Sequence, residues 1–149
     1  MSLRHISNYA ELKSTGGLKT PARWHNKGIP VVYLSETPSL AMLEILVHFE
    51  MAPDEVPISY QLLEIEYSGG RKGVSQLADD ALLSDWRDNI TLTQAIGDEW
   101  LSSLKGALLR VPSAVVPHSF NYLLNPRHEL AHRATIIASR SHPFDSRLL

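Results

Sequence analysis

The sequence predicts an α+β fold with a mixed sheet at its core and helices on its flanks. Short β-prone runs outnumber the helical segments, and the two kinds do not alternate as they would in a doubly wound sheet. The composition is that of a folded chain, with 44% hydrophobic and 20% charged residues in a length of 149. Because no repeat, low-complexity tract or long polar linker interrupts it, we expect residues 1–149 to form a single domain.

The composition also excludes several classes of function. A formal net charge of −2 gives no basic field for direct binding to nucleic acid. The chain has no cysteine, so disulfides, thiolate nucleophiles and cysteine-bound metals are absent. Neither a signal-peptide pattern at the start nor an apolar run long enough for a bilayer is found. We therefore expect a cytoplasmic protein that does not bind membranes.

The first half of the chain predicts strand, strand, helix and strand in that order. Residues 3–6 and 31–34 are β-prone runs, the second of them bracketed by polar loop residues. Thr37-Pro38 has the pattern of an N-cap followed by proline at the first helical position. The helix that follows, to about residue 49, is apolar on nearly every side and is expected to be buried. Residues 58–67 form a strand whose alternation changes parity near Leu62-Leu63, where we expect a bulge.

The second half predicts one helix and three strands. Residues 69–73 form a turn, and Thr91 to Gln94 has the spacing of a capping box. The helix should run to about Leu104 and stop at Gly106, with Gly97 weakening it modestly. Strands are predicted at residues 108–111, 114–116 and 135–139, separated by prolines.

Glu44 is the most informative single residue. Within the apolar run of the first helix it is accompanied by only one other ionisable residue, His48, one turn further on the same face. A carboxylate on a buried helix is costly unless it is paired or used in chemistry. Glu44 is therefore either a functional group or a structural one tied to His48 or to a buried arginine.

Arg23 and Tyr33 are the next candidates. Arg23 follows a glycine-containing loop and precedes a strand, a position suited to bidentate recognition of phosphate or carboxylate. The alternative is a surface arginine stacked on Trp24. Tyr33, third in its strand, offers a ring face and a hydroxyl to a ligand, although strand tyrosines more often serve packing.

Two further motifs carry less information. Ser113 places one hydroxyl in an apolar run, without the GxSxG elbow of a hydrolase nucleophile, so hydrogen bonding is its expected role. His128, Glu129 and His132 resemble the HExxH zinc motif. Proline at 126 makes a zinc-binding helix improbable there, and no metal is expected.

These segments together resemble the RES family, toxins paired with helix-turn-helix antitoxins and named for arginine, glutamate and serine. The resemblance is carried by ARWHNKGIPVVYLSETPSLAMLEILVH, GDEWLSSLKGALLRVPSAVVPHSFNYLLNPRH and HPFDSRLL, in order and over nearly the whole chain. It implies a fold similar to ADP-ribosyltransferase domains and an activity that cleaves the nicotinamide–ribose bond of NAD. NAD would be a consumed substrate, with phosphate or water as acceptor, and no cofactor is implied.

The resemblance also implies roles for individual residues. The catalytic residues would be Arg23, Glu44 and Ser113. Glu44 would stabilise the oxocarbenium-like state, and Ser113 would anchor Glu44 or the ribose. Binding of NAD would fall to Arg4, Arg23, Tyr33 and Asn121, with the arginines on the phosphates.

Two positions depart from the family pattern. Alignment on Ile6-Ser7 puts His5 where the family has an arginine, with Arg4 one residue away. In a strand, one residue moves a side chain to the opposite face. In addition, Ala22 replaces the usual glycine before Arg23 and restricts the loop's backbone.

The family pattern further implies an Xre-type antitoxin as partner and a homodimer. Three alternatives remain beside an NAD-degrading toxin: a protein ADP-ribosyltransferase of the same fold, a weakened module that acts by binding its antitoxin, and a ribonuclease using Arg23, His25, Arg127 and His128. The missing basic patch counts against the ribonuclease.

Overall fold

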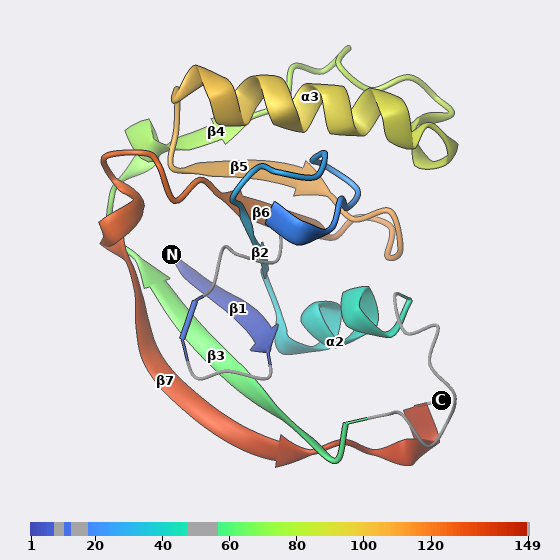
Figure 1. The fold of residues 1–149 in the computed structure, drawn as a ribbon, viewed down its shortest axis with the longest axis vertical. Helices are drawn as coiled ribbons and strands as arrows, with labels where there is room; N and C mark the ends of the chain where they lie inside the picture. Colours follow the sequence, from blue (N-terminus) through green and yellow to red (C-terminus); the bar gives the residue numbers. More distant parts are fainter. Residues whose placement is uncertain (8–10, 13–17, 48–56, 149) are drawn as a thin grey trace.

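A computed structural model describes residues 1–7, 11–12, 18–47 and 57–148. Its strands form a seven-stranded sheet in the order β4-β5-β6-β2-β1-β3-β7 (Figure 1). The strands are β1 (Ser2–Ser7), β2 (Val32–Ser35), β3 (Ser59–Tyr67), β4 (Val74–Gln76), β5 (Leu108–Pro112), β6 (Phe120–Leu124) and β7 (Ala134–Pro143). The helices are α2 (Pro38–Leu46) and α3 (Ile90–Ser103), with short 3-10 turns η2 (Arg71–Gly73), η3 (Trp86–Asp88), η4 (Ala131–Arg133) and η5 (Ser146–Leu148). The α+β prediction is confirmed.

The backbone pairing of the sheet is interrupted between β1 and β2. β1 and β3 pair at six register positions, whereas β1 and β2 pair only at Arg4↔Ser35. Among the pairings, only β4 with β5 is parallel. Figure 1 shows α3 lying along β4 and β5, and the long strands β3 and β7 curving away on the other side of β1. The weak junction between the two halves is where a cavity forms.

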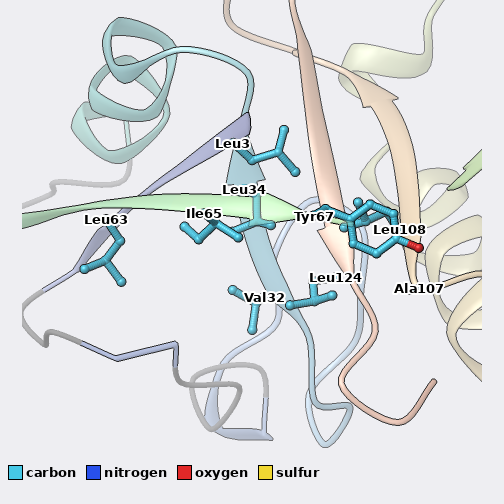
Figure 2. Close-up of a cluster of buried hydrophobic side chains, with 9 residues drawn as sticks. All are labelled: Leu3, Val32, Leu34, Leu63, Ile65, Tyr67, Ala107, Leu108 and Leu124. Atoms are coloured by element: carbon cyan, nitrogen blue, oxygen red, sulfur yellow. The ribbon is translucent and has the colours of Figure 1, made fainter. Parts of the chain in front are cut away.

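Alternation along β2 assigns its residues to two cores on opposite faces of the sheet. Val32 and Leu34 belong to one cluster, which Figure 2 shows with contributions from β1, β3, β5 and β6. Tyr33 packs against the other cluster, which is built around three tryptophans and the inner face of α3: Trp24, Val31, Trp86, Trp100, Leu101, Leu109, Val111 and Leu123. Because Ser35 has the parity of Tyr33, its hydroxyl lies on the same face as the Tyr33 ring.

The first helix begins as predicted but is less buried than predicted. Thr37 caps α2, since its hydroxyl accepts from the N–H of Leu40 at 3.1 Å, and Pro38 takes the first position. Leu40 and Ala41 are buried, whereas Leu43 is 41% and Val47 55% exposed. The prediction of burial on every side is therefore wrong, because only one side of α2 packs against β1 and β2. The predicted helix end near residue 49 and the partner His48 lie outside the described residues.

Replacing Thr37 with alanine is expected to destabilise the fold by about 1 kcal/mol, because the N–H of Leu40 loses its acceptor. Urea denaturation of both proteins measures this difference. Thr37→Ser is the matched control, since serine keeps the accepting oxygen. Equal losses in the two variants would contradict a capping role.

Several second-half predictions need correction. The cap of α3 is Asn89, whose side chain accepts from the N–H of Leu92 at 3.2 Å, and not the box starting at Thr91. The helix ends at Ser103, and Leu104 takes a left-handed conformation with φ 54°. The shift of register in β3 falls between Glu64 and Ile65, two residues beyond the expected bulge.

The predicted strand at residues 114–116 is wrong. Those residues form a turn whose backbone bonds to the Ser113 side chain, and the strand that follows is β6. Strands β4 and β6 were not predicted, and β7 is longer than the predicted 135–139. No helix within the described ranges combines the length and apolarity needed to cross a bilayer.

Candidate functional site

A cavity of about 270 Å³ lies where β1 and β2 part. Its walls come from β1, β2, β6, α2, the loop before β2, and the end of β5 with the segment that follows it. Five of the six predicted site residues line it: Arg4, Arg23, Tyr33, Glu44 and Asn121. His5 lines it as well. Most of the remaining lining is apolar, as is usual for small-molecule sites.

The Glu44 carboxylate is held from behind by two side chains. Ser113 Oγ donates to Oε1 at 2.5 Å, and Asn121 Nδ2 donates to the same oxygen at 2.7 Å. Ser35 Oγ in turn donates to Asn121 Oδ1 at 2.7 Å, which fixes the amide with its nitrogen toward Glu44. Both bonds are made to Oε1, and Glu44 itself lines the cavity.

Ser113 lies behind Glu44 and does not line the cavity. Its side chain is 2% exposed, and its Oγ accepts from the N–H groups of Val115 and Val116 at 3.1 and 3.0 Å. Because its single proton is donated to Glu44, the hydroxyl fastens the carboxylate to the turn after β5. This arrangement makes Ser113 an anchor and not a nucleophile.

Ser113→Ala is expected to lower the free energy of unfolding by about 1–3 kcal/mol, because two partly buried N–H groups and Oε1 of Glu44 lose a partner together. Thermal unfolding monitored by circular dichroism measures the loss. Ser102→Ala, an exposed change on α3, is the control and should leave the midpoint within a degree or two. A midpoint for Ser113→Ala equal to that of the control would contradict the anchoring role.

The Tyr33 hydroxyl bonds to the loop before β2. It lies 2.7 Å from His25 Nδ1 and accepts from the N–H of Trp24 at 3.2 Å. His25 is 2% exposed, and its other nitrogen, Nε2, lies 3.0 Å from the carbonyl oxygen of Thr20. Burial raises the pKa of the Tyr33 phenol, opposed by the Trp24 N–H and assisted by the negative charge of Asp98. Tyr33 is therefore neutral, with its hydroxyl engaged outside the cavity.

The loop that carries Arg23 is bound to α3 through its backbone. Thr93 Oγ1 donates to the carbonyl of Arg23 at 2.6 Å, and Gln94 Nε2 donates to that of Ala22 at 3.0 Å. Thr93 is fully buried. These bonds satisfy two loop carbonyls that would otherwise face the protein interior.

One turn further along α3, the contact with the loop becomes closer. A Cβ placed on Gly97 would lie 1.7 Å from the carbonyl oxygen of Trp24. Asp98 accepts from the backbone N–H of Asn26 at 3.0 Å and from its side-chain amide at 2.6 Å. Packing against the loop therefore requires glycine at position 97. The sequence analysis treated Gly97 only as a residue that weakens the helix and did not predict this contact.

Among the described residues, Arg23 makes no cation–π contact with Trp24. Its Nη1 donates to the carbonyl of Arg87 at 2.7 Å, at η3, while the Arg87 guanidinium lies over the Trp86 ring at 4.7 Å. Arg23 lines the cavity. The bond to Arg87 directs one of its donors and leaves the remaining N–H groups of the guanidinium for a ligand.

Arg4 and His5 both line the cavity, but they bond to different partners. Arg4 bonds to Ser2 Oγ at 2.6 Å and forms an ion pair with Glu64 at 3.5 Å, which offsets part of its charge. His5 Nδ1 donates to the carbonyl of Tyr33 at 2.8 Å, bridging β1 and β2 where their ladder is broken. Burial lowers the pKa of His5, with this bond acting in the opposite direction, so the ring is neutral near pH 7.

Sequence reasoning missed two residues that orient the site, Ser35 and Thr93. Ser35 had a usable signal, because it ends a β-prone run with the same parity as Tyr33. The histidines of HELAH turn to local backbone: His128 Nδ1 accepts from the N–H of Leu130, and His132 Nδ1 bonds to the carbonyl of Glu129. Among the residues the structure describes, no cluster of three metal-ligating side chains was found.

The chain is similar in sequence to a known family and to several named proteins. The family model described as RES domain matches residues 3–146. Toxin Res of Pseudomonas putida is 45% identical over 148 residues, which cover 99% of this chain and 99% of that protein. Toxin Res of Photorhabdus laumondii subsp. laumondii is 36% identical, with 96% and 92% covered. A Sphingobium sp. protein named Prs ADP-ribosylating toxin is 30% identical, with 93% and 87% covered.

A solved structure has the same fold. A chain of the M. tuberculosis MbcT–MbcA toxin–antitoxin complex superposes with a TM-score of 0.74, covering 99% of this chain and 85% of that one. The sequence identity is 16%, so the likeness concerns the fold alone.

Proposed function

This chain belongs to the RES domain family, and from that premise we propose that it is a toxin that cleaves the bond between nicotinamide and ribose in NAD. The observation that carries the proposal is the Glu44 carboxylate, which lines the cavity and is fixed through Oε1 by Ser113 and Asn121. The toxin names of the relatives support the biological class. The Glu44 carboxylate in the cavity lining supports the proposed cleavage of NAD.

In the proposed reaction the bond from C1′ of the ribose to the nicotinamide nitrogen breaks, and its electron pair leaves with nicotinamide. The ribose carbon then carries positive charge in an oxocarbenium-like state. A carboxylate held rigidly beside that charge stabilises it without having to reorganise. The two donors on Oε1 supply that rigidity. An oxygen of water or phosphate adds to C1′ and loses its proton.

The other cavity residues bind the rest of the dinucleotide in this proposal. The ring of Tyr33 lies against the nicotinamide, and Arg23 binds a phosphate oxygen through its free donors. Arg4 contributes less, because Glu64 offsets its charge. His5 is neutral and takes no part as a cation.

The direct test is whether purified protein consumes NAD and releases nicotinamide, followed by chromatography in buffers with and without phosphate. The proposal expects nicotinamide in proportion to NAD lost. Dependence of the rate on phosphate identifies phosphorolysis, and independence identifies hydrolysis. Intact NAD in both buffers would overturn the proposal and favour a module that acts only by binding.

The partner in the proposal is an antitoxin of the Xre helix-turn-helix type, and the toxin is a cytoplasmic homodimer. The fold shared with a chain of a toxin–antitoxin complex supports an antitoxin partner. Co-expression tests it, since the antitoxin should restore growth that the toxin alone arrests.

A second function is favoured by one relative, the Sphingobium protein named as an ADP-ribosylating toxin. In this second function the group that adds to C1′ is a side chain of another protein. Glu44 would stabilise the positive charge on the ribose carbon in the same way. Incubating a cell extract with biotin-labelled NAD separates the two functions. Labelled protein indicates transfer to protein, whereas loss of NAD without labelled protein indicates degradation.

A further inference from the structure

His25 is buried, titratable and unused by the reaction proposed above, yet it lies directly behind a wall of the cavity. Its two ring nitrogens bond to different parts of the molecule, Nε2 to the carbonyl of Thr20 and Nδ1 to the hydroxyl of Tyr33. The two rings are 5.6 Å apart and tilted by 48°. We propose that His25 is a positioning residue that acts through the Tyr33 hydroxyl to hold the Arg23 wall of the cavity in place.

The hydrogen bonds determine which nitrogen of His25 carries the proton. A carbonyl oxygen only accepts, so Nε2 must donate to Thr20 at 3.0 Å. In the neutral ring Nδ1 then has a lone pair and accepts the proton of the Tyr33 hydroxyl at 2.7 Å. The proposal therefore assigns the Nε2–H tautomer to His25 and the donor role to Tyr33.

The Tyr33 hydroxyl bonds to the loop twice. Its proton goes to His25, and its oxygen accepts from the N–H of Trp24. The proton of the hydroxyl is thus used within the protein. Tyr33 offers its ring to the cavity while its oxygen fastens the loop to β2.

The loop that carries Arg23 is hydrogen-bonded to two elements, α3 and β2. On one side Thr93 binds the carbonyl of Arg23 itself, from α3. On the other side Tyr33 binds Trp24 and His25, from β2. Removing the His25 link leaves the bond from Trp24 N–H to Tyr33 and the bonds from α3, so the loop and its Arg23 guanidinium are held less firmly at the cavity. The effect should fall on NAD binding, because Arg23 contacts phosphate in both ground and transition states.

The kinetic test rests on the proposed function and uses a double-mutant cycle. His25→Leu and Tyr33→Phe are each expected to raise KM for NAD about three- to tenfold, with a smaller effect on kcat. Because both remove the same bond, the double variant should be no worse than the poorer single variant. His25→Asn, which retains an oxygen acceptor near the place of Nδ1, should recover part of the loss.

Tyr122→Phe is the matched control, since Tyr122 packs against the opposite core and lies outside the cavity lining. Its KM should equal that of the parent. Additive effects of the two single variants, or a change confined to kcat, would overturn the proposal. Should His25→Leu fail to fold, Tyr33→Phe and the measurement below decide the question.

An independent test needs no activity. Long-range ¹H–¹⁵N spectra of the labelled wild-type protein report the tautomer of each histidine, and the His25→Asn spectrum assigns the signal of His25. The proposal expects the Nε2–H tautomer at pH 7.5, with the Nδ1 shift moving in Tyr33→Phe as its donor is lost. An Nδ1–H tautomer would overturn it. Because this readout is independent of NAD, a wild-type protein that leaves NAD intact refutes the proposed function without affecting this test.

Discussion

Replacing Glu44 with glutamine is expected to lower kcat for NAD cleavage by about 10²–10³-fold. Glutamine has the size of glutamate, and its amide oxygen still accepts from Ser113 and Asn121. The negative charge beside the ribose carbon is lost, so the transition state loses stabilisation that the ground state does not need. KM for NAD should therefore change little. Nicotinamide release under saturating NAD measures the difference.

Glu99→Gln is the matched control, because it removes one carboxylate from the exposed surface of α3. Its kcat should match the parent, and the thermal midpoints of both variants should lie close together. If Glu44→Gln retains most of the parental turnover, Glu44 has no part in the mechanism and is a structural tie between α2 and the turn after β5.

The second large effect is expected at Gly97, and here two arguments predict opposite signs. Helix propensity alone predicts that Gly97→Ala stabilises α3 by up to about 1 kcal/mol. The structure predicts the reverse, because the new Cβ would lie 1.7 Å from the carbonyl oxygen of Trp24. Backbone on both sides must shift, at a cost of roughly 1–3 kcal/mol. For a chain of this size, that lowers the thermal midpoint by about 2–4 °C per kcal/mol.

Activity reports on the same contact. Displacing the loop moves Arg23, so KM for NAD should rise in Gly97→Ala. Ser102→Ala, on the exposed side of the same helix, controls for propensity and should be neutral or slightly stabilising. A Gly97→Ala protein more stable than its parent would show that the approach of α3 to the loop is looser than described.

Predictions from the sequence succeeded where the signal was local. Thr37-Pro38 predicted the start of α2 because an N-cap needs only an acceptor three residues before a donor. Strands β1, β2, β3 and β5 were predicted from short β-prone runs. Asn89 was overlooked because an asparagine three residues before Leu92 competes with the box starting at Thr91, and spacing alone does not rank the two.

The prediction failed at residues 114–116 because a side chain overrode the propensity of the backbone. The two valines favour a strand, but the Ser113 hydroxyl accepts from their N–H groups and closes a turn. That turn brings Ser113 to Glu44. The residues of β6 that follow supply Asn121, so the missed strand carries one wall of the site.

The class of fold and the family resemblance could be read from the sequence, as could the choice of Glu44, an isolated carboxylate in an apolar helix, as the leading candidate. Those conclusions depend on residue types and on spacings within single segments. The surroundings of Glu44 became visible with the folded structure, since Ser113 and Asn121 are 69 and 77 residues away along the chain. The folded structure also decided that α3 shapes the Arg23 loop and that the Tyr33 hydroxyl bonds to His25. A hydrogen bond forms only between atoms brought within about 3 Å, and that proximity follows from the packing of the sheet and its helices.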